Sequence, residues 1–299
     1  MTYREITCKS AINKLGKSRL PYRYDLNIYR GCQHGCRYCF ALYSHQYMES
    51  ADFYGEIFVK TNIAEQLEVQ LKSPGWKGQV INIGGVTDSY QPAEAGYRLM
   101  PRVLELMIKY KNPVIISTKS DLILRDFDLI GKLASLTYVN VAATITTPDE
   151  GLRQRLEPGA VSSERRFAML DAFRKTKASR GLHVMPVIPL LTDSRQSLEQ
   201  LFLRGKECGV SYLLAEPLNL RGRTRDAFWD FIRRCYPGLL EDLQELYGSG
   251  RLDRAYLYRL YRLLAELRKT YGLSADFLGS MKALSERDNQ RGGQQLSLF

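Results

Sequence analysis

Residues 25–40 read DLNIYRGCQHGCRYCF, a short β-rich run followed at once by three closely spaced cysteines. The run Asp25–Arg30 predicts a strand, and Cys32, Cys36 and Cys39 form a C-x3-C-x2-C array directly behind it. In folds built from parallel strands, chemistry collects on the loops that follow the carboxyl ends of the strands. The array is therefore expected to be the functional loop of the protein.

The rest of the first 220 residues repeats a strand-then-helix pattern. Further β-rich runs lie at Val80–Gly84, Pro113–Thr118, Tyr138–Ile145, His183–Pro189 and Ser211–Pro217. Segments with helical spacing separate them, at Asn62–Leu71, Tyr97–Tyr110, Arg125–Ala134, Ser163–Ser179 and Arg195–Cys208. This alternation predicts an α/β fold with a parallel sheet whose apolar strands are buried on both faces. An open doubly wound sheet and a partial barrel both fit, although six units are fewer than the eight of a complete barrel.

After Leu218 the β-rich runs stop and helical spacing takes over. Helices are predicted at Arg225–Cys235, Leu239–Tyr247 and Arg254–Tyr271, and from Ser285 the chain becomes polar. We therefore expect three parts: a catalytic domain at 1–220, a helical C-terminal appendage at 221–284, and a flexible tail at 285–299.

Composition indicates a globular protein that stays in the cytoplasm. No stretch approaches the roughly 18 to 20 apolar residues of a membrane span, and the first residues lack a secretory signal. Three of the six cysteines are bunched, which favours a metal site over a disulfide framework. The net charge of +11 favours a polyanionic partner such as nucleic acid, although solubility alone is also a sufficient reason for such a charge.

Three thiolates on one tight loop can hold three irons of a cubane cluster, whose all-cysteine form would need a fourth. Because no fourth cysteine is nearby, one iron would keep an open position at which a ligand can bind. The alternative is a zinc site closed by His34 or His45. Zinc motifs usually pair two short ligand clusters, and this sequence has no second pair.

The array C-x3-C-x-aromatic-C, placed after the first strand of a six-unit βα chain, resembles the radical S-adenosylmethionine superfamily. The resemblance implies a partial (β/α)6 TIM-like barrel, a [4Fe-4S] cluster on Cys32, Cys36 and Cys39, and S-adenosylmethionine bound at the open iron. It also implies that one-electron reduction releases a 5′-deoxyadenosyl radical, and that Tyr38 lies near the adenine. The alternative for Tyr38 is simple core packing.

The same resemblance implies a cofactor pocket at the other strand ends. Gly84 and Gly85 stand where the superfamily receives the methionine amino group. The usual acidic residue after them is missing, so Asp88 or backbone carbonyls must serve, unless the glycines only form a turn. Lys119 could pair with the cofactor carboxylate and Ser117 could reach the ribose, although Lys119 could also be a solvated lysine. Two further rim positions are Thr144 and Arg166.

Four stretches, NIYRGCQHGCRYCFA, GGVTDSYQPAE, ISTKSDLILRD and the LEPG run ending in Arg165-Arg166, are similar to the spore-photoproduct-lyase-like branch, often described as DNA repair photolyases. This implies hydrogen abstraction from nucleic acid, DNA more than RNA, in lesion repair, with an electron donor such as flavodoxin or ferredoxin. True lyases carry a hydrogen-donating cysteine after strand 2, where Gly85 or Val86 stands here, and Tyr90 is our candidate donor instead. The alternatives are an RNA- or protein-modifying radical enzyme and a non-catalytic zinc or iron–sulfur nucleic-acid-binding module.

Two C-terminal features also bear on partners. The pentapeptide Gln295–Phe299 (QLSLF) resembles the peptide that binds the bacterial sliding clamp, because it presents one glutamine and three apolar side chains on a polar tether. It could instead fold back onto the appendage. The helix Arg254–Tyr271 interleaves arginines with tyrosines, which suits phosphates and bases. An amphipathic helix with a solvated basic face explains the same pattern.

Overall fold

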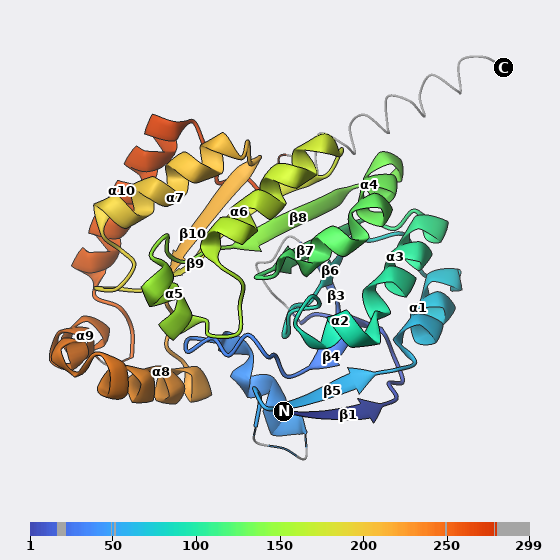
Figure 1. Cartoon of the computed structure of the whole chain (residues 1–299), viewed down its shortest axis with the longest axis horizontal. Coiled ribbons are helices and arrows are strands. Elements are labelled where there is room, and N and C mark those ends of the chain that lie inside the picture. Colours follow the sequence, from blue (N-terminus) through green and yellow to red (C-terminus); the bar gives the residue numbers. More distant parts are fainter. Residues whose placement is uncertain (17–21, 49, 51, 249, 278, 280–299) are drawn as a thin grey trace.

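The computed structural model describes residues 1–16, 22–48, 50, 52–248, 250–277 and 279. Its centre is a seven-stranded sheet in the order β10-β9-β8-β7-β6-β3-β2 (Figure 1). These strands are β2 (Ile12–Lys14), β3 (Tyr24–Leu26), β6 (Ile81–Ile83), β7 (Val114–Thr118), β8 (Val139–Thr144), β9 (Ser179–Val187) and β10 (Tyr212–Pro217). From β3 to β10 the strands are parallel and adjacent in chain order, whereas β2 pairs antiparallel with β3. This sequential order, open between β10 and β2, confirms the partial (β/α)6 barrel.

The crossover helices cover the outer face of the sheet, as right-handed βα connections require. They are α1 (Ile63–Lys72), α3 (Leu99–Tyr110), α4 (Phe127–Leu136), α6 (Ser163–Ala172) and α7 (Arg195–Glu207). Their apolar stripes pack on alternate strand residues such as Val114, Ile116 and Val141, which belong to the main hydrophobic core. This core fixes the strands whose carboxyl ends carry the site.

The inner face of the sheet differs from the expectation of strands that are apolar on both sides. Register places Asp25 beside Asn82, and Asn82 beside Ile115, which in turn lies beside Asn140. One step toward the carboxyl ends, Ser117, Ala142 and Gly181 form a second row, with Tyr212 beside the glycine. Since side chains in register on parallel strands point the same way, the inner face is lined by polar and small residues.

The predicted strand Asp25–Arg30 was wrong as one unit. Its first half is β3, and its last two residues form a separate short strand, β4 (Tyr29–Arg30). The strand β4 belongs to a second, three-stranded sheet together with β5 (Glu56–Lys60) and β1 (Thr2–Ile6). Tyr29 pairs with Val59 in antiparallel register. The division arises from pairing with a distant strand, and local β-propensity carries no information about such pairing.

Two helix predictions were also too long. The helix predicted at Ser163–Ser179 ends at Ala172, continues as a short 3₁₀ turn at Phe173–Lys175, and gives way to β9 at Ser179. The helix predicted at Tyr97–Tyr110 is α3, which begins two residues later at Leu99, because Tyr97 ends the separate short helix α2 (Ala93–Tyr97) and Arg98 between them lies at φ 50°. The Glu94 carboxylate accepts the backbone N–H groups of Leu99 and Met100 at 3.1 and 3.0 Å, which starts the second helix. The helix α5 (Glu150–Leu156), the 3₁₀ helix at Asp121–Asp126 and that at Phe40–Tyr47 were not predicted.

The C-terminal helices agree with the prediction to within three residues. They are α8 (Gly222–Cys235), α9 (Leu240–Tyr247) and α10 (Arg254–Tyr271), with a 3₁₀ turn at Pro237–Leu239. The inner residues of α10 belong to the main core, and those of α8 and α9 share a second cluster with Cys36 and Tyr38. The helices therefore pack directly on the barrel. A domain boundary at residue 220 stays a prediction, and the tail 285–299 lies outside the described residues.

Within the part of the chain that the structure describes, no helix combines the length and apolar character needed to cross a membrane.

Candidate active site

The cysteine loop follows β4 and is held by two separate parts of the chain, the segment before β5 and the start of α8. The Cys32 N–H donates to the Phe53 carbonyl at 3.0 Å. The carbonyl of Cys36 accepts the Tyr54 hydroxyl at 2.7 Å, and that of Cys39 accepts the Thr224 hydroxyl of α8 at 2.9 Å. These bonds hold the backbone and leave the three sulfur atoms free to bind a ligand.

Glycines let this loop pack tightly against its neighbours. Gly31 and Gly35 have φ of 81° and 66°, which is the region glycine tolerates best. Gly159, in the loop after α5, approaches so closely that a Cβ there would lie 2.0 Å from the Gln33 carbonyl oxygen. The cysteine loop is therefore packed between the chain that enters β5 and the chain after β8.

None of the three cysteines of the loop forms a disulfide, and their thiols have little contact with solvent. Cys32 and Cys36 are buried and Cys39 is half-buried. Burial raises the pKa of Cys32 to about 12 and also raises the pKa of Cys36 and of Cys39, while the nearby Lys119 ammonium opposes this rise at the latter two. A metal that binds here would displace the thiol protons, as metal binding to cysteine generally does.

The donor set fits an iron–sulfur cluster better than a single zinc ion. Both ring nitrogens of His34 are engaged, Nδ1 with the Gly159 carbonyl at 3.1 Å and Nε2 with Asp88 at 2.9 Å. His45 packs edge-on against the Phe53 and Phe58 rings. Among the residues described, no three His, Cys, Asp or Glu side chains converge to hold one ion. In a cubane each thiolate binds a different iron, so three thiols on one loop suit that cluster.

Asp88 joins the loops of three strands. Its carboxylate is hydrogen-bonded to the His34 ring of the cysteine loop. It also accepts hydrogen bonds from the Tyr90 N–H at 2.9 Å, the Thr118 hydroxyl at 2.8 Å and the Lys119 N–H at 2.8 Å. Burial by itself would raise the pKa of Asp88, but the His34 charge and these donors lower it to about 2. Asp88 was predicted to accept the cofactor amino group. That role stays a prediction, because here its lone pairs are engaged in holding the three loops together.

The Gly84-Gly85 pair lies directly after β6, as expected. Gly84 has φ of 90°, and a Cβ on Gly85 would lie 2.4 Å from the Asp25 carboxylate. Asp25 is itself buried and accepts the Asn82 amide at 2.9 Å. The two glycines therefore expose backbone beside a buried carboxylate, which is compatible with the predicted contact to an ammonium group.

Lys119 emerges from the carboxyl end of β7 toward the cysteine loop. Its ammonium nitrogen lies 5.7 Å from the centre of the Tyr38 ring, and within the described residues it forms no ion pair with a carboxylate. Ser117 and Thr144 lie on the same inner face as Lys119, in register with Ala142 and His183 respectively. The structure thus brings the predicted carboxylate-binding and ribose-binding side chains to one edge of the sheet.

Tyr38 and Arg166 meet on one buried carboxylate, that of Glu157. The Tyr38 hydroxyl donates to Glu157, the Thr146 hydroxyl donates to the same oxygen at 3.0 Å, and Arg166 forms an ion pair with the other at 2.5 Å. Arg166 also donates to the Thr144 carbonyl at 2.8 Å. Arg166 and Glu157 are fully buried. In this conformation Arg166 supports the cysteine-loop tyrosine through Glu157, and its predicted role in the cofactor pocket stays a prediction.

Tyr90 is fully buried on the outer side of the strand ends. Its hydroxyl donates to Asp126 at 3.1 Å, and burial together with that carboxylate raises its pKa well above the usual value. The ring lines a cavity of about 400 Å³ shared with His34, Arg125 and Arg165. Its role as a hydrogen-atom donor stays a prediction, and in this conformation its phenolic hydrogen is directed at Asp126.

His183 is a site residue that was not predicted from the sequence. His183 of β9 faces the inner side of the barrel, where its Nε2 lies 3.1 Å from the Tyr212 hydroxyl. Burial, with the Lys119 charge, lowers the pKa of His183 to about 4, so its imidazole is neutral near pH 7. The sequence contains one indication of this role, because His183 is a polar residue within the apolar run LHVMPVI.

Comparison with known proteins agrees with this geometry. The sequence profile of the radical SAM superfamily matches residues 26–201, more than half of the chain. An uncharacterized protein of Mycobacterium tuberculosis is 37% identical over 281 residues, covering 92% of this chain and 83% of the relative.

Solved structures share the fold. A spore photoproduct lyase mutant superposes with a TM-score of 0.67 at 16% identity, covering 90% of this chain and 79% of that chain. The lyase complexed with a dinucleoside spore photoproduct gives 0.65 at 14% identity, with the same coverage. SuiB of Streptococcus suis bound to S-adenosylmethionine gives 0.51 at 14% identity, covering 82% and 48%.

Radical SAM proteins use a [4Fe-4S] cluster and S-adenosylmethionine, and Cys32, Cys36 and Cys39 are the side chains of this chain that would hold the cluster. When bound, the reduced cluster supplies the electron that cleaves the cofactor. The matched profile and the fold together identify the chain as a radical SAM enzyme, a member of the radical SAM superfamily.

Proposed function

We propose that this radical SAM enzyme abstracts hydrogen from a nucleotide of DNA and acts in the repair of a DNA lesion. The observation that carries the proposal is the fold likeness to spore photoproduct lyase over 90% of this chain, including a structure with a dinucleoside lesion bound. The net charge of +11 supports a polyanionic substrate. The polar and small side chains on the inner face of the sheet suit a polar substrate better than an apolar one.

We expect the final step of the reaction to differ from one in which a cysteine thiol in the loop after β6 donates the hydrogen. Gly85 and Val86 occupy that loop. Of the cysteines outside the cluster loop, Cys208 is buried in the main core on the outer side of the sheet, where its Sγ donates to the Phe167 carbonyl. Cys235 is exposed at the end of α8. The third, Cys8, is half-buried, and its N–H donates to the Asn62 side chain before α1 at 2.8 Å. We therefore propose a lyase-like reaction whose hydrogen is returned by a group other than these three thiols.

The test is transfer of deuterium into 5′-deoxyadenosine. The full chain, reconstituted anaerobically and reduced by dithionite or by a flavodoxin or ferredoxin, is incubated with S-adenosylmethionine and deuterated oligonucleotides. Ultraviolet-irradiated and unirradiated DNA and matched RNA are compared, and 5′-deoxyadenosine is analysed by mass spectrometry. We expect enrichment with DNA, strongest for irradiated DNA. Enrichment from RNA or a peptide alone would replace this proposal with the corresponding modifying activity.

We further propose that Gln295–Phe299 binds the bacterial sliding clamp, on the strength of the QLSLF sequence, which lies outside the described residues. Deleting these five residues should remove binding to purified clamp while leaving S-adenosylmethionine cleavage unchanged. Surface plasmon resonance measures the first and chromatography of 5′-deoxyadenosine the second. A matched chain with Leu298 and Phe299 changed to alanine should behave like the deletion, and retained clamp binding in both would refute the assignment.

A further inference from the structure

The helix α10 has an inner face that is fully used in packing. Tyr256, Leu260, Leu264 and Leu267 are buried in the main core. The spacing of these residues by three and four positions forms a single apolar stripe. The Tyr256 hydroxyl also donates to Asp193, in the segment after β9, at 2.9 Å. Packing of the helix therefore accounts for this stripe and leaves its other residues unexplained.

The outward side of α10 carries an unusual set of side chains, which we call the α10 face: Arg254, Tyr258, Arg259, Tyr261 and Arg262. All five are exposed, and the Tyr258 and Tyr261 side chains are 68% and 42% accessible. None of the three arginines forms an ion pair with a described carboxylate. Exposed arginines elsewhere do find partners, for example Arg165 with Asp121 and Arg195 with Glu266. Among the described residues, the α10 face thus presents three arginines without an ion pair at contact distance, beside two aromatic rings.

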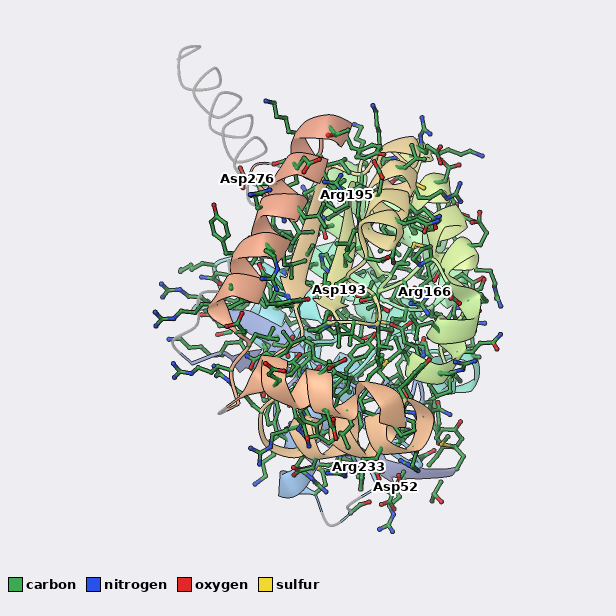
Figure 2. All side chains as sticks on the ribbon, turned by 90° about the vertical axis from the view of Figure 1, so that its left-hand side faces the viewer. Asp52, Arg166, Asp193, Arg195, Arg233 and Asp276 are labelled. Carbon is green, nitrogen blue, oxygen red and sulfur yellow. The ribbon has the colours of Figure 1, made fainter. Side chains whose placement is uncertain are left out.

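The α10 face lies at the open side of the barrel. The Tyr261 hydroxyl donates to Glu216, next to the carboxyl end of β10, at 2.8 Å. The strand β10 is the terminal strand of the sheet, on the side where the barrel does not close. Figure 2 views the molecule from this side, with α10 running beside the strands and Asp193 near the N-terminal end of this helix. The face therefore borders the carboxyl end of β10, at the open edge of the sheet.

We propose that the α10 face is a docking surface for a DNA strand with unstacked bases, which it holds beside the open side of the barrel. Arginine guanidinium groups bind phosphate oxygens, and an exposed tyrosine ring stacks on an unpaired base. At about 1.5 Å rise per residue, Arg254 to Arg262 spans about 12 Å along the helix, which is long enough to contact more than one phosphate of a strand. The proposal rests on the proposed function, in which DNA supplies the substrate.

The experiment compares the full-length protein with four variants by fluorescence anisotropy, using labelled single-stranded DNA, duplex DNA and RNA over a range of salt. Replacing Arg254, Arg259 and Arg262 together with glutamine should weaken binding to single-stranded DNA at least about tenfold, and should reduce the salt slope by about 2. A control with equal loss of charge, Arg102, Lys132 and Lys175 to glutamine, removes exposed cations from other helices. This control should bind within about twofold of the parent, because those cations lie away from the face. Tyr258→Ala should weaken binding about 5- to 100-fold, whereas Tyr258→Phe should preserve it.

Iron content and the thermal midpoint verify that each variant is folded. Equal losses in the triple variant and its control would overturn the proposal, because the effect would then be one of total charge. Tighter binding to RNA or to duplex DNA than to single-stranded DNA would overturn the choice of occupant. Deuterium transfer from DNA combined with an unaffected triple variant would refute the surface and leave the proposed function standing. Weakened DNA binding by the triple variant without deuterium transfer from DNA would support the docking surface and refute the proposed function.

Discussion

Replacing Cys36 with alanine is expected to abolish both iron retention and S-adenosylmethionine cleavage. Cys36 supplies one of only three thiols on the loop, and its backbone is held independently by the Tyr54 hydroxyl at 2.7 Å. The loop should therefore keep its place while losing a ligand. Changes to groups that merely orient a metal ligand cost about 10- to 100-fold in affinity or activity, so removing a direct ligand should cost more than about 100-fold. Iron analysis and 5′-deoxyadenosine formation measure the two effects.

Cys235→Ser is the matched control, because it removes an exposed thiol at the end of α8. That variant should keep about four irons per chain, as expected for a [4Fe-4S] cluster, and full cleavage activity. If the Cys36 variant retained the parent's iron, or if both variants lost iron equally, the assignment of the loop as the cluster site would fail.

Replacing Arg166 with methionine is expected to destabilise the fold by about 3–5 kcal/mol, since removing one partner of a buried ion pair strands the other charge. Arg166 and Glu157 are fully buried and 2.5 Å apart. Urea unfolding at pH 7 measures the loss. As a control, Arg195→Met breaks the exposed pair with Glu266 and should cost less than about 1 kcal/mol. Adding Glu157→Gln to Arg166→Met should restore part of the loss, because the stranded charge disappears.

The same pair predicts a pH dependence. Burial alone would raise the pKa of Glu157, but the Arg166 guanidinium and the Lys119 ammonium lower it below its ordinary value. A lowered carboxyl pKa stabilises the fold above the unfolded-state pKa of about 4.3, and this contribution is lost as the pH falls through the folded-state value. In the Arg166 variant burial dominates and Glu157 takes up a proton more readily. The stability gap between parent and variant should therefore shrink on acidification, and a constant gap from pH 7 to pH 4 would contradict the account.

The sequence was sufficient for the features that repeat or that are local. Period-2 and period-3.6 patterns located the six parallel strands and most of the crossover helices, because each pattern is set within a dozen residues. The cysteine spacing identified the superfamily for the same reason. The glycines at 84 and 85 were placed correctly at a strand end because backbone conformation is a local property.

The sequence by itself thus determined the βα repeat and the cluster motif, whereas the tertiary structure decided which polar side chains meet. Tyr38 and Glu157 are separated by 119 residues, and His34 and Asp88 by 54. No local pattern encodes such pairs, since they form only when the loops after β4, β6, β7 and β8 gather at one end of the sheet. The division of Asp25–Arg30 between two sheets, and the exposed arginines and tyrosines of α10, likewise depend on what packs against each segment. Packing is a property of the closed fold, and burial there decides which charges need partners.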